Sequence, residues 1–187
     1  MENSEKSSLR KVLLEKRDSI SFDLMKIASK QIHRNLKKIT EFSIAKSIGC
    51  YYPVGSEVLT QDIMQEALSE DKEILLPKVV GKDLMFRKIK GLNSLEKGNF
   101  DIMEPRDNCP PSEKLDVVLI PAIGISRNGF RLGYGFGYYD RFLAKIDVTT
   151  IALTYAKQIV KSIPSSENDV RIDWVVTEDE FFNFSNS

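Results

Sequence analysis

The sequence predicts an α/β fold: one three-layer domain, residues 1–187, whose mostly parallel sheet is flanked by helices. Segments with apolar residues at helical spacing alternate along the chain with short apolar runs typical of strands. The run at 115–121 is almost wholly apolar, as expected of a strand that is covered on both faces. A length of 187 residues suits a single domain with a substantial core.

The first part of the chain is expected to form two helices. The first covers 8–20, and Ser21 is a candidate cap for the second. The apolar positions of this second helix recur at helical spacing and are Leu24, Ile27, Ala28, Ile32, Leu36 and Ile39. His33 falls on the side rich in Lys and Arg, so we expect an exposed surface histidine rather than a catalytic one.

The middle of the chain predicts strands around one more helix. A short apolar run at 47–54, ended by proline and glycine, is typical of a buried strand. Thr60 is a candidate start of a helix with an apolar face formed by Ile63, Met64, Ala67 and Leu68. The strand at 74–80 and the segment 84–90 flank a Gly-Lys-Asp turn, which predicts a hairpin.

The second half is expected to be irregular at 91–114, where three prolines occur, and then to form the strand at 115–121. A turn at 126–129 leads to a glycine-rich segment, and a helix is expected to start near Tyr139. The last two strands are predicted at 150–155 and 174–177.

Composition excludes several classes of function. Basic and acidic residues balance at 27 each, which argues against a broad nucleic-acid surface but leaves room for a local basic pocket. Cys50 and Cys109 have no Cys-x-x-Cys neighbour and His33 is the only histidine, so we expect free thiols and no zinc site. The N-terminus is polar and no stretch approaches the length of a membrane span. We therefore expect a cytoplasmic monomer with no membrane or nucleic-acid partner.

The segment Arg131–Asp140 carries the strongest functional signal. Gly133, Gly135 and Gly137 alternate, although such glycines weaken a strand. They let a backbone approach an anion and turn its N–H groups toward it, and Arg131 can add a charge-assisted hydrogen bond to phosphate. The spacing matches neither the Rossmann fingerprint nor a Walker A loop. On the glycines alone, a flexible loop between a strand and a helix is an equal alternative.

The whole string Arg-Leu-Gly-x-Gly-x-Gly-Tyr-Tyr-Asp at 131–140 resembles the signature of the 5-formyltetrahydrofolate cyclo-ligase family. Further matches follow the family's order over nearly the full chain: Lys6 to Arg10, 51–57, 116–121, Gln158, Pro164 and 168–169. The resemblance implies a Rossmann-like fold of the isomerase and CoA-transferase type. It also implies that ATP and Mg²⁺ drive conversion of 5-formyltetrahydrofolate to 5,10-methenyltetrahydrofolate, with release of ADP and phosphate.

The resemblance also implies residue roles. Lys6 and Arg10 share one face of the first helix and would contact ATP phosphates, although a solvated basic face is the alternative from the residues alone. Arg10 and Tyr138 would be the catalytic residues. The nucleotide would be bound by Lys6 and Arg10 and by nine consecutive residues of the glycine-rich segment: Arg131, Leu132, Gly133, Tyr134, Gly135, Phe136, Gly137, Tyr138 and Tyr139. Family members with basic residues between the glycines differ here, since this chain has Tyr134 and Phe136.

The folate substrate would contact four residues: Tyr52, Glu57, Tyr134 and Tyr138. Asp140 and Asp169 match positions linked to magnesium, whose preferred ligands are carboxylate, water and phosphate oxygens. From the residues alone, Asp140 could instead cap a helix, Asp169 could belong to a turn, and Asp173 stays an alternative metal-linked acid.

Two other functions stay open at this point. A sugar-phosphate isomerase or CoA-transferase-like enzyme on a related scaffold would explain an anion-binding loop without ATP. It would not explain the Lys6 and Arg10 pair together with the Tyr-Tyr-Asp ending. A non-catalytic nucleotide- or folate-binding module would use the same residues as the enzyme.

Overall fold

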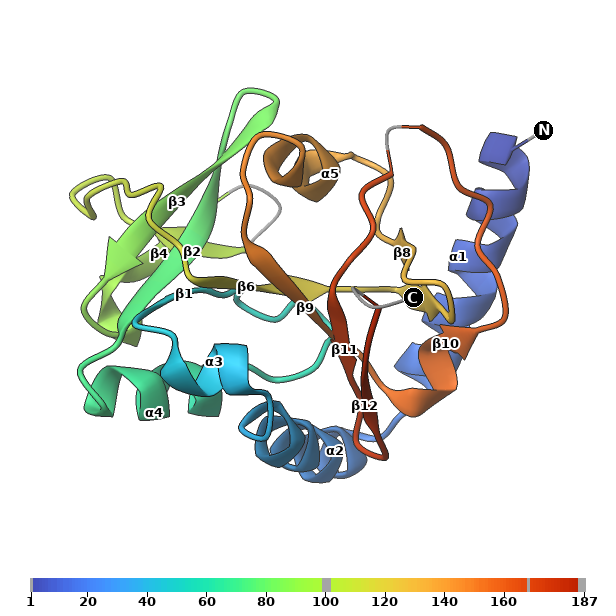
Figure 1. Ribbon diagram of the computed structural model, residues 1–187, viewed down its shortest axis with the longest axis horizontal. Helices are drawn as coiled ribbons and strands as arrows, with labels where there is room; N and C mark the ends of the chain where they lie inside the picture. The colour runs from blue at the N-terminus through green and yellow to red at the C-terminus, as the bar shows by residue number, and fades with distance from the viewer. Residues whose placement is uncertain (1, 99–101, 168, 185–187) are drawn as a thin grey trace.

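A seven-stranded sheet runs through the centre of the computed structural model, which describes residues 2–98, 102–167 and 169–184 (Figure 1). In spatial order its strands are β12 (Phe181–Asn183), β11 (Trp174–Val176), β9 (Thr149–Leu153), β6 (Val117–Pro121), β1 (Ser47–Gly49), β2 (Glu73–Val80) and β3 (Asp83–Ile89). Neighbours from β11 to β2 pair in parallel, and both edge strands are antiparallel. The mostly parallel sheet and the β2–β3 hairpin are therefore confirmed.

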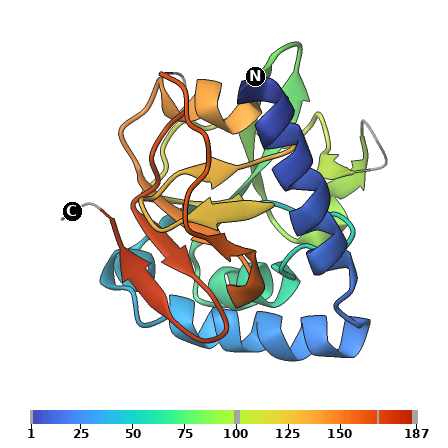
Figure 2. The same ribbon diagram turned by 90° about the vertical axis from the view of Figure 1, so that its right-hand side faces the viewer.

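Helices cover both faces of this sheet. Figure 1 shows α2 (Phe22–Leu36), α3 (Thr40–Ile44) and α4 (Gln61–Ser69) on one face and α5 (Tyr138–Leu143) on the other. In Figure 2 the first helix, α1 (Glu2–Asp18), lies across a second sheet of order β10-β7-β8. These three strands are β10 (Ile159–Val160), β7 (Gly124–Ser126) and β8 (Arg131–Leu132). The smaller elements are η1 (Leu92–Ser94), β4 (Leu95–Lys97), β5 (Met103–Pro105) and η3 (Ala156–Gln158).

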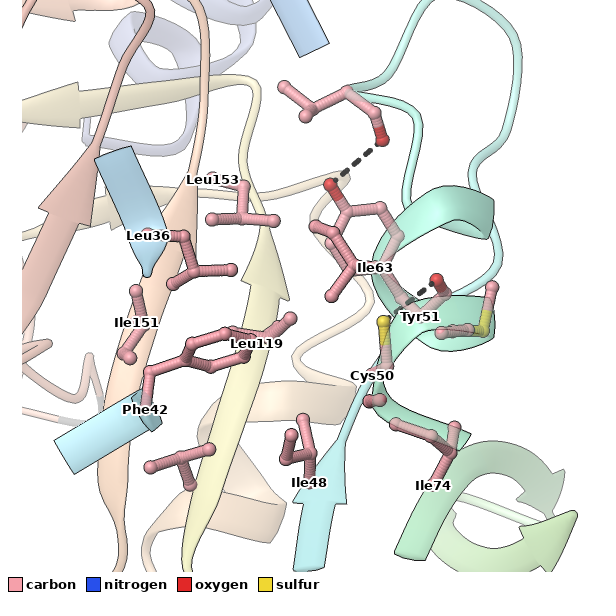
Figure 3. Close-up of a cluster of buried hydrophobic side chains, with 14 of the residues drawn as sticks. Leu36, Phe42, Ile48, Cys50, Tyr51, Ile63, Ile74, Leu119, Ile151 and Leu153 are labelled. Carbon is pink, nitrogen blue, oxygen red and sulfur yellow. Dashed lines mark hydrogen bonds between the residues drawn. The ribbon is translucent and has the colours of Figure 1, made fainter. Parts of the chain in front are cut away.

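The strands of the central sheet place alternate side chains in two separate cores. In β6, Val117 and Leu119 pack with the α2, α3 and α4 side, whereas Val118 and Ile120 pack with the α5 side. All four are buried, which explains why this segment is almost continuously apolar. Figure 3 shows Leu119 beside Phe42 of α3 in the first of these cores.

Several local expectations were wrong. The second helix ends at Leu36, and Ile39 instead precedes the separate helix α3. The segment 91–114, expected to be irregular, contains the antiparallel pair β4–β5. The edge strand β12 was not predicted. Ser21 does cap α2, since its hydroxyl accepts a hydrogen bond from the Leu24 N–H.

His33 is not the exposed histidine that the helix pattern predicted. Its side chain is only 12% exposed, and Nε2 lies 3.2 Å from Glu66 Oε2 on α4. Burial lowers the pKa of His33, although Glu66 opposes this shift. The ring therefore joins two helices instead of facing solvent. Cys50 and Cys109 are both free thiols and both buried, as expected.

The order of the strands creates a crevice between β1 and β6. These two strands are neighbours in the sheet. The next strand in the sequence after β1 that belongs to this sheet, β2, lies on one side of the pair, and the next one after β6, β9, lies on the other side. Their carboxyl ends, at Gly49 and Pro121, therefore lead into segments that diverge. In open α/β sheets such a switch point is where ligands bind.

Leu13 is expected to hold α1 against the second sheet. It is 1% exposed and packs with Ile123, Leu132 and Ile163. Leu13→Ala should lower the free energy of unfolding by about 2–5 kcal/mol because it leaves a cavity. Chemical denaturation checks this expectation. Val12→Ala is the control, because Val12 is next to Leu13 in the sequence but is 47% exposed. Equal small losses in both variants would show that α1 is not anchored through Leu13.

Candidate active site

A cavity of about 480 Å³ opens at the switch point between β1 and β6. Its walls come from α1, the segment after β1, the β2–β3 hairpin with β5, and the glycine-rich segment. Every residue that the sequence assigned to the site lines it: Lys6, Arg10, Tyr52, Glu57, Arg131, Leu132, Gly133, Tyr134, Gly135, Phe136, Gly137, Tyr138, Tyr139, Asp140 and Asp169. Residues from both ends of the chain thus meet in one space.

The glycine-rich segment links β8 to α5 through backbone conformations that favour glycine. Gly135 has φ +99° and Gly137, which precedes the first turn of α5, has φ +68°. Both angles lie in the left-handed region, where a Cβ is disfavoured. At Gly133 a Cβ would lie 2.5 Å from Arg131 Nη1, so the end of the Arg131 side chain would have to shift. The glycines therefore permit a loop conformation that other residues would rarely adopt.

Lys6 and Arg10 reach this loop and its surroundings from α1. Arg10 Nε donates a hydrogen bond of 2.7 Å to the Gly133 carbonyl. Lys6 Nζ lies 2.6 Å from Asp169 Oδ2, and its side chain is only 11% exposed. The two basic residues therefore face the cavity, and the alternative of a solvated basic face does not hold.

Arg131 is held by the protein at the base of the loop. Its Nη2 pairs with Asp140 Oδ2 at 3.1 Å, and its guanidinium lies 5.4 Å from the centre of the Tyr139 ring. The side chain is only 6% exposed. These contacts clamp β8 to α5, a structural role that the sequence did not suggest. Burial raises the pKa of Tyr139, so its hydroxyl stays protonated over the physiological range.

Glu57 enters the cavity from the turn that follows β1. The Val54 N–H donates to Glu57 Oε2 at 2.9 Å, and Gly55 has φ +58° in the same turn. The side chain is 5% exposed. Burial raises the pKa of Glu57, while the Val54 N–H, Arg17 and Tyr134 oppose that shift. The result is a buried carboxylate with nearby donors that favour its ionised form.

Sequence reasoning missed two buried charged residues at the site. Arg17 is 3% exposed and contacts Tyr134 and Glu57. It continues the helical stripe formed by Lys6, Arg10 and Leu13, and that spacing could have revealed it. Glu104 of β5 also lines the cavity and is 5% exposed, but its segment was interpreted as irregular, so no pattern indicated it.

The three acids considered as metal ligands differ in their surroundings. Asp140 and Asp169 line the cavity and pair with Arg131 and Lys6, respectively. Asp173 lies outside the cavity lining and accepts hydrogen bonds of 2.8 Å from the Thr150 N–H and hydroxyl. Among the described residues no group of three His, Cys, Asp or Glu side chains could hold a metal. Two carboxylates still fit Mg²⁺, which proteins commonly bind through one or two carboxylates plus substrate phosphates.

This fold and site define an α/β protein with a cavity that is lined by basic and acidic side chains, a glycine-rich loop and aromatic rings. Comparison with known proteins identifies its relatives. The model of the 5-formyltetrahydrofolate cyclo-ligase family matches residues 2–178, and the chain belongs to that family. It therefore has 5-formyltetrahydrofolate cyclo-ligase activity, is a ligase of folate one-carbon metabolism, and uses ATP as the family does.

Similar proteins match over nearly their full lengths. The structure of 5,10-methenyltetrahydrofolate synthetase from Aquifex aeolicus is 32% identical, covers 97% of this chain and 94% of its own, and superimposes with a TM-score of 0.88. The synthetase from Mycoplasma pneumoniae is 25% identical, with coverage of 93% and 99% and a TM-score of 0.77. A probable 5-formyltetrahydrofolate cyclo-ligase from Caenorhabditis elegans is 27% identical over 95% of this chain and 98% of its own.

The Lys6–Asp169 ion pair should make stability depend on pH. Burial of Asp169 opposes its ionisation, but hydrogen bonds from Lys6 and Ser166 hold its pKa below the ordinary value of 3.8. Because the pKa is lower in the folded state, the ionised Asp169 carboxylate stabilises the fold above pH 3.8. This stabilisation is lost as the pH falls through the lowered pKa of the folded state. Asp169→Asn should therefore lower the thermal midpoint at pH 7, and the difference from the unsubstituted protein should shrink toward pH 3.

The exposed residue Asp147 provides the control for this measurement. Asp147→Asn should change the midpoint little at either pH. A deficit of Asp169→Asn that stayed constant from pH 7 to pH 3 would show that the carboxylate charge is not what stabilises the fold.

Proposed function

We propose that the reaction proceeds through a phosphorylated formyl group. The formyl oxygen of 5-formyltetrahydrofolate attacks the terminal phosphorus of ATP, and the bond to ADP breaks. N10 then attacks the formyl carbon and loses its proton, and the carbon–oxygen bond to phosphate breaks. The products are 5,10-methenyltetrahydrofolate, ADP and phosphate. The observation that carries this proposal is that Lys6, Arg10 and the glycine-rich loop line the same cavity as Glu57.

The nucleotide half of the cavity would be formed by α1 and residues 131–139. Phosphoryl transfer depends mainly on positioning and on neutralising negative charge. Lys6 and Arg10 supply two cations, and the loop supplies backbone donors beside them. Arg10 already lies against the loop, since a Cβ at Gly135 would be 3.4 Å from its guanidinium carbon. This contact with the loop supports a role for Arg10 in binding the phosphate that is transferred.

The folate half would be formed by Tyr52, Glu57, Tyr134 and Tyr138. A pterin ring presents N–H donors along one edge, and the buried Glu57 carboxylate can accept them. The tyrosine rings offer flat apolar faces for the pterin or for the formyl group. Tyr138 begins α5, directly after the last glycine of the loop, so it is suited to lie between the two substrates.

Magnesium would be held by Asp140 and Asp169 together with ATP phosphates. When bound, Mg²⁺ neutralises developing charge on the transferred phosphoryl group. Both carboxylates are now paired with cations, Arg131 and Lys6, so ion binding would exchange part of these contacts. Binding of the metal to a two-acid site is favoured only when the phosphates complete the coordination.

Other attributes stay as proposals. The described helices include none that is long and apolar enough to cross a membrane. The single domain, the monomeric state and the cytoplasmic location remain predictions, and one relative from Arabidopsis thaliana is named as mitochondrial. Family membership speaks against the isomerase or CoA-transferase-like alternative. Family membership also speaks against a non-catalytic binding module.

The purified protein is expected to consume ATP only when 5-formyltetrahydrofolate is present. Absorbance of the methenyl product should rise in step with ADP release, and chelation of Mg²⁺ should stop both. The assay combines product absorbance with a coupled ADP measurement. If both ligands bind without product formation, the chain is a binding module and the proposed function is wrong.

Arg10→Ala is expected to weaken ATP use more than folding. Loss of a charge-assisted phosphate contact costs about 1.5–3 kcal/mol, which corresponds to roughly a tenfold to hundredfold lower kcat/KM for ATP. Lys11→Ala is the matched control because Lys11 is an exposed neighbour on α1. Steady-state kinetics and thermal midpoints of both variants check the expectation. A lower midpoint with unchanged kcat/KM would make Arg10 structural.

A further inference from the structure

One buried guanidinium at the site has no role in the proposed reaction. Arg17 of α1 is 3% exposed. Its Nε donates to the Ser56 hydroxyl at 2.9 Å, and its Nη2 donates to the Tyr134 hydroxyl at 2.8 Å. Its Nη1 is buried without a hydrogen-bond partner in the described part of the chain and lies 3.9 Å from Glu57 Oε1. One donor group is therefore aimed at the carboxylate but stops short of a hydrogen bond.

Stability does not explain this arrangement. A buried cation loses its hydration, and its pairing compensates only when its donors are satisfied. A buried ion pair adds little net stability compared with two well-packed apolar residues, and here one donor of Arg17 also has no hydrogen-bond partner in the described part of the chain. The incomplete pairing of Arg17 with Glu57 therefore points to a role in the ligand-bound protein.

The donors of Arg17 connect the two halves of the cavity. Tyr134 belongs to the glycine-rich loop, which would bind the nucleotide, and its ring would also contact the folate, whereas Ser56 and Glu57 belong to the turn after β1 on the folate side. The guanidinium is planar and rigid, so its donors move together. A movement of Tyr134 with the loop would pull on Nη2 and so alter the distance from Nη1 to Glu57. Burial raises the pKa of Glu57, and approach of this cation favours the ionised carboxylate.

We infer that Arg17 is a positioning residue that couples ATP binding to folate binding. Closure of the glycine-rich loop on the nucleotide phosphates draws Tyr134 along, and the guanidinium follows. The 3.9 Å gap between Nη1 and Glu57 Oε1 then closes to a hydrogen bond, which orients the carboxylate for the pterin donors. This inference rests on the proposed function, because it assigns the two sides of the cavity to the two substrates.

Calorimetric titration tests the coupling directly. The dissociation constant of 5-formyltetrahydrofolate is measured with and without a saturating non-hydrolysable ATP analogue and Mg²⁺. In the unsubstituted protein the analogue should tighten folate binding by at least about fivefold, the lower end of usual couplings between sites. Tyr134→Phe removes the hydroxyl that holds Nη2 and that also interacts with Glu57, so the ratio of the two constants should fall close to one.

Arg17→Lys separates charge from geometry. It keeps the cation but replaces the planar fork, so it should also lose the coupling. Lys16→Met alters the exposed neighbour on α1 and should keep the coupling of the unsubstituted protein. If Arg17→Lys lowers the thermal midpoint, Tyr134→Phe decides, because Tyr134 is 46% exposed and its ring is retained.

Two results would overturn the inference. A ratio of one in the unsubstituted protein would show that the two sites are independent. A ratio that Tyr134→Phe leaves unchanged would show that coupling does not pass through Arg17. In either case, normal turnover would still support the proposed function. If the protein bound neither substrate, both the proposed function and this inference would be wrong.

Discussion

The contact between Leu13 and Gly124 fixes the position of α1, and the site depends on it. A Cβ at Gly124 would lie only 2.4 Å from Leu13 Cδ1, so the leucine occupies space that only a glycine leaves. Because a helix repeats every 3.6 residues, the orientation that buries Leu13 also turns neighbouring positions of the same stripe toward the cavity. The contact between Leu13 and Gly124 therefore also determines the direction in which Lys6, Arg10 and Arg17 point, although none of these three residues takes part in it.

The cations of the cavity are already engaged before any ligand arrives. Lys6 pairs with Asp169, Arg131 with Asp140, and Arg10 with the Gly133 carbonyl. Such contacts hold side chains that would otherwise sample many rotamers, so less order has to be imposed when phosphate binds. The cavity thus holds basic side chains whose acidic partners line the same space, as expected in a chain with no net charge.

Periodicity was sufficient to predict the central sheet but not its margins. The parallel strands lie between two apolar cores, so they are continuously hydrophobic and easy to recognise. The pair β4–β5 and the edge strand β12 are three residues each and half-exposed in places, which leaves no such pattern. His33 was misplaced for a related reason, since its burial comes from α4 rather than from its own helix.

The candidate site was predicted as a set of positions but not as a set of contacts. The glycine-rich string lines one cavity together with Lys6, Arg10, Glu57 and Asp169, because the fold brings α1 and the segment after β1 to the switch point. The clamp of Arg131 on Asp140 and the network around Arg17 depend on burial and on partners from other elements. No local pattern encodes these pairings, so they became visible only in three dimensions.

The ion pair between Lys6 and Asp169 joins positions separated by 163 residues. During synthesis α1 leaves the ribosome early, whereas Asp169 follows only after all but the last two strands of the central sheet. A nascent chain therefore carries the basic residues of the cavity long before it carries their acidic partner. The cavity is complete only when the end of the domain has emerged. The protein can therefore bind a nucleotide in this cavity only after nearly the whole chain has been synthesised.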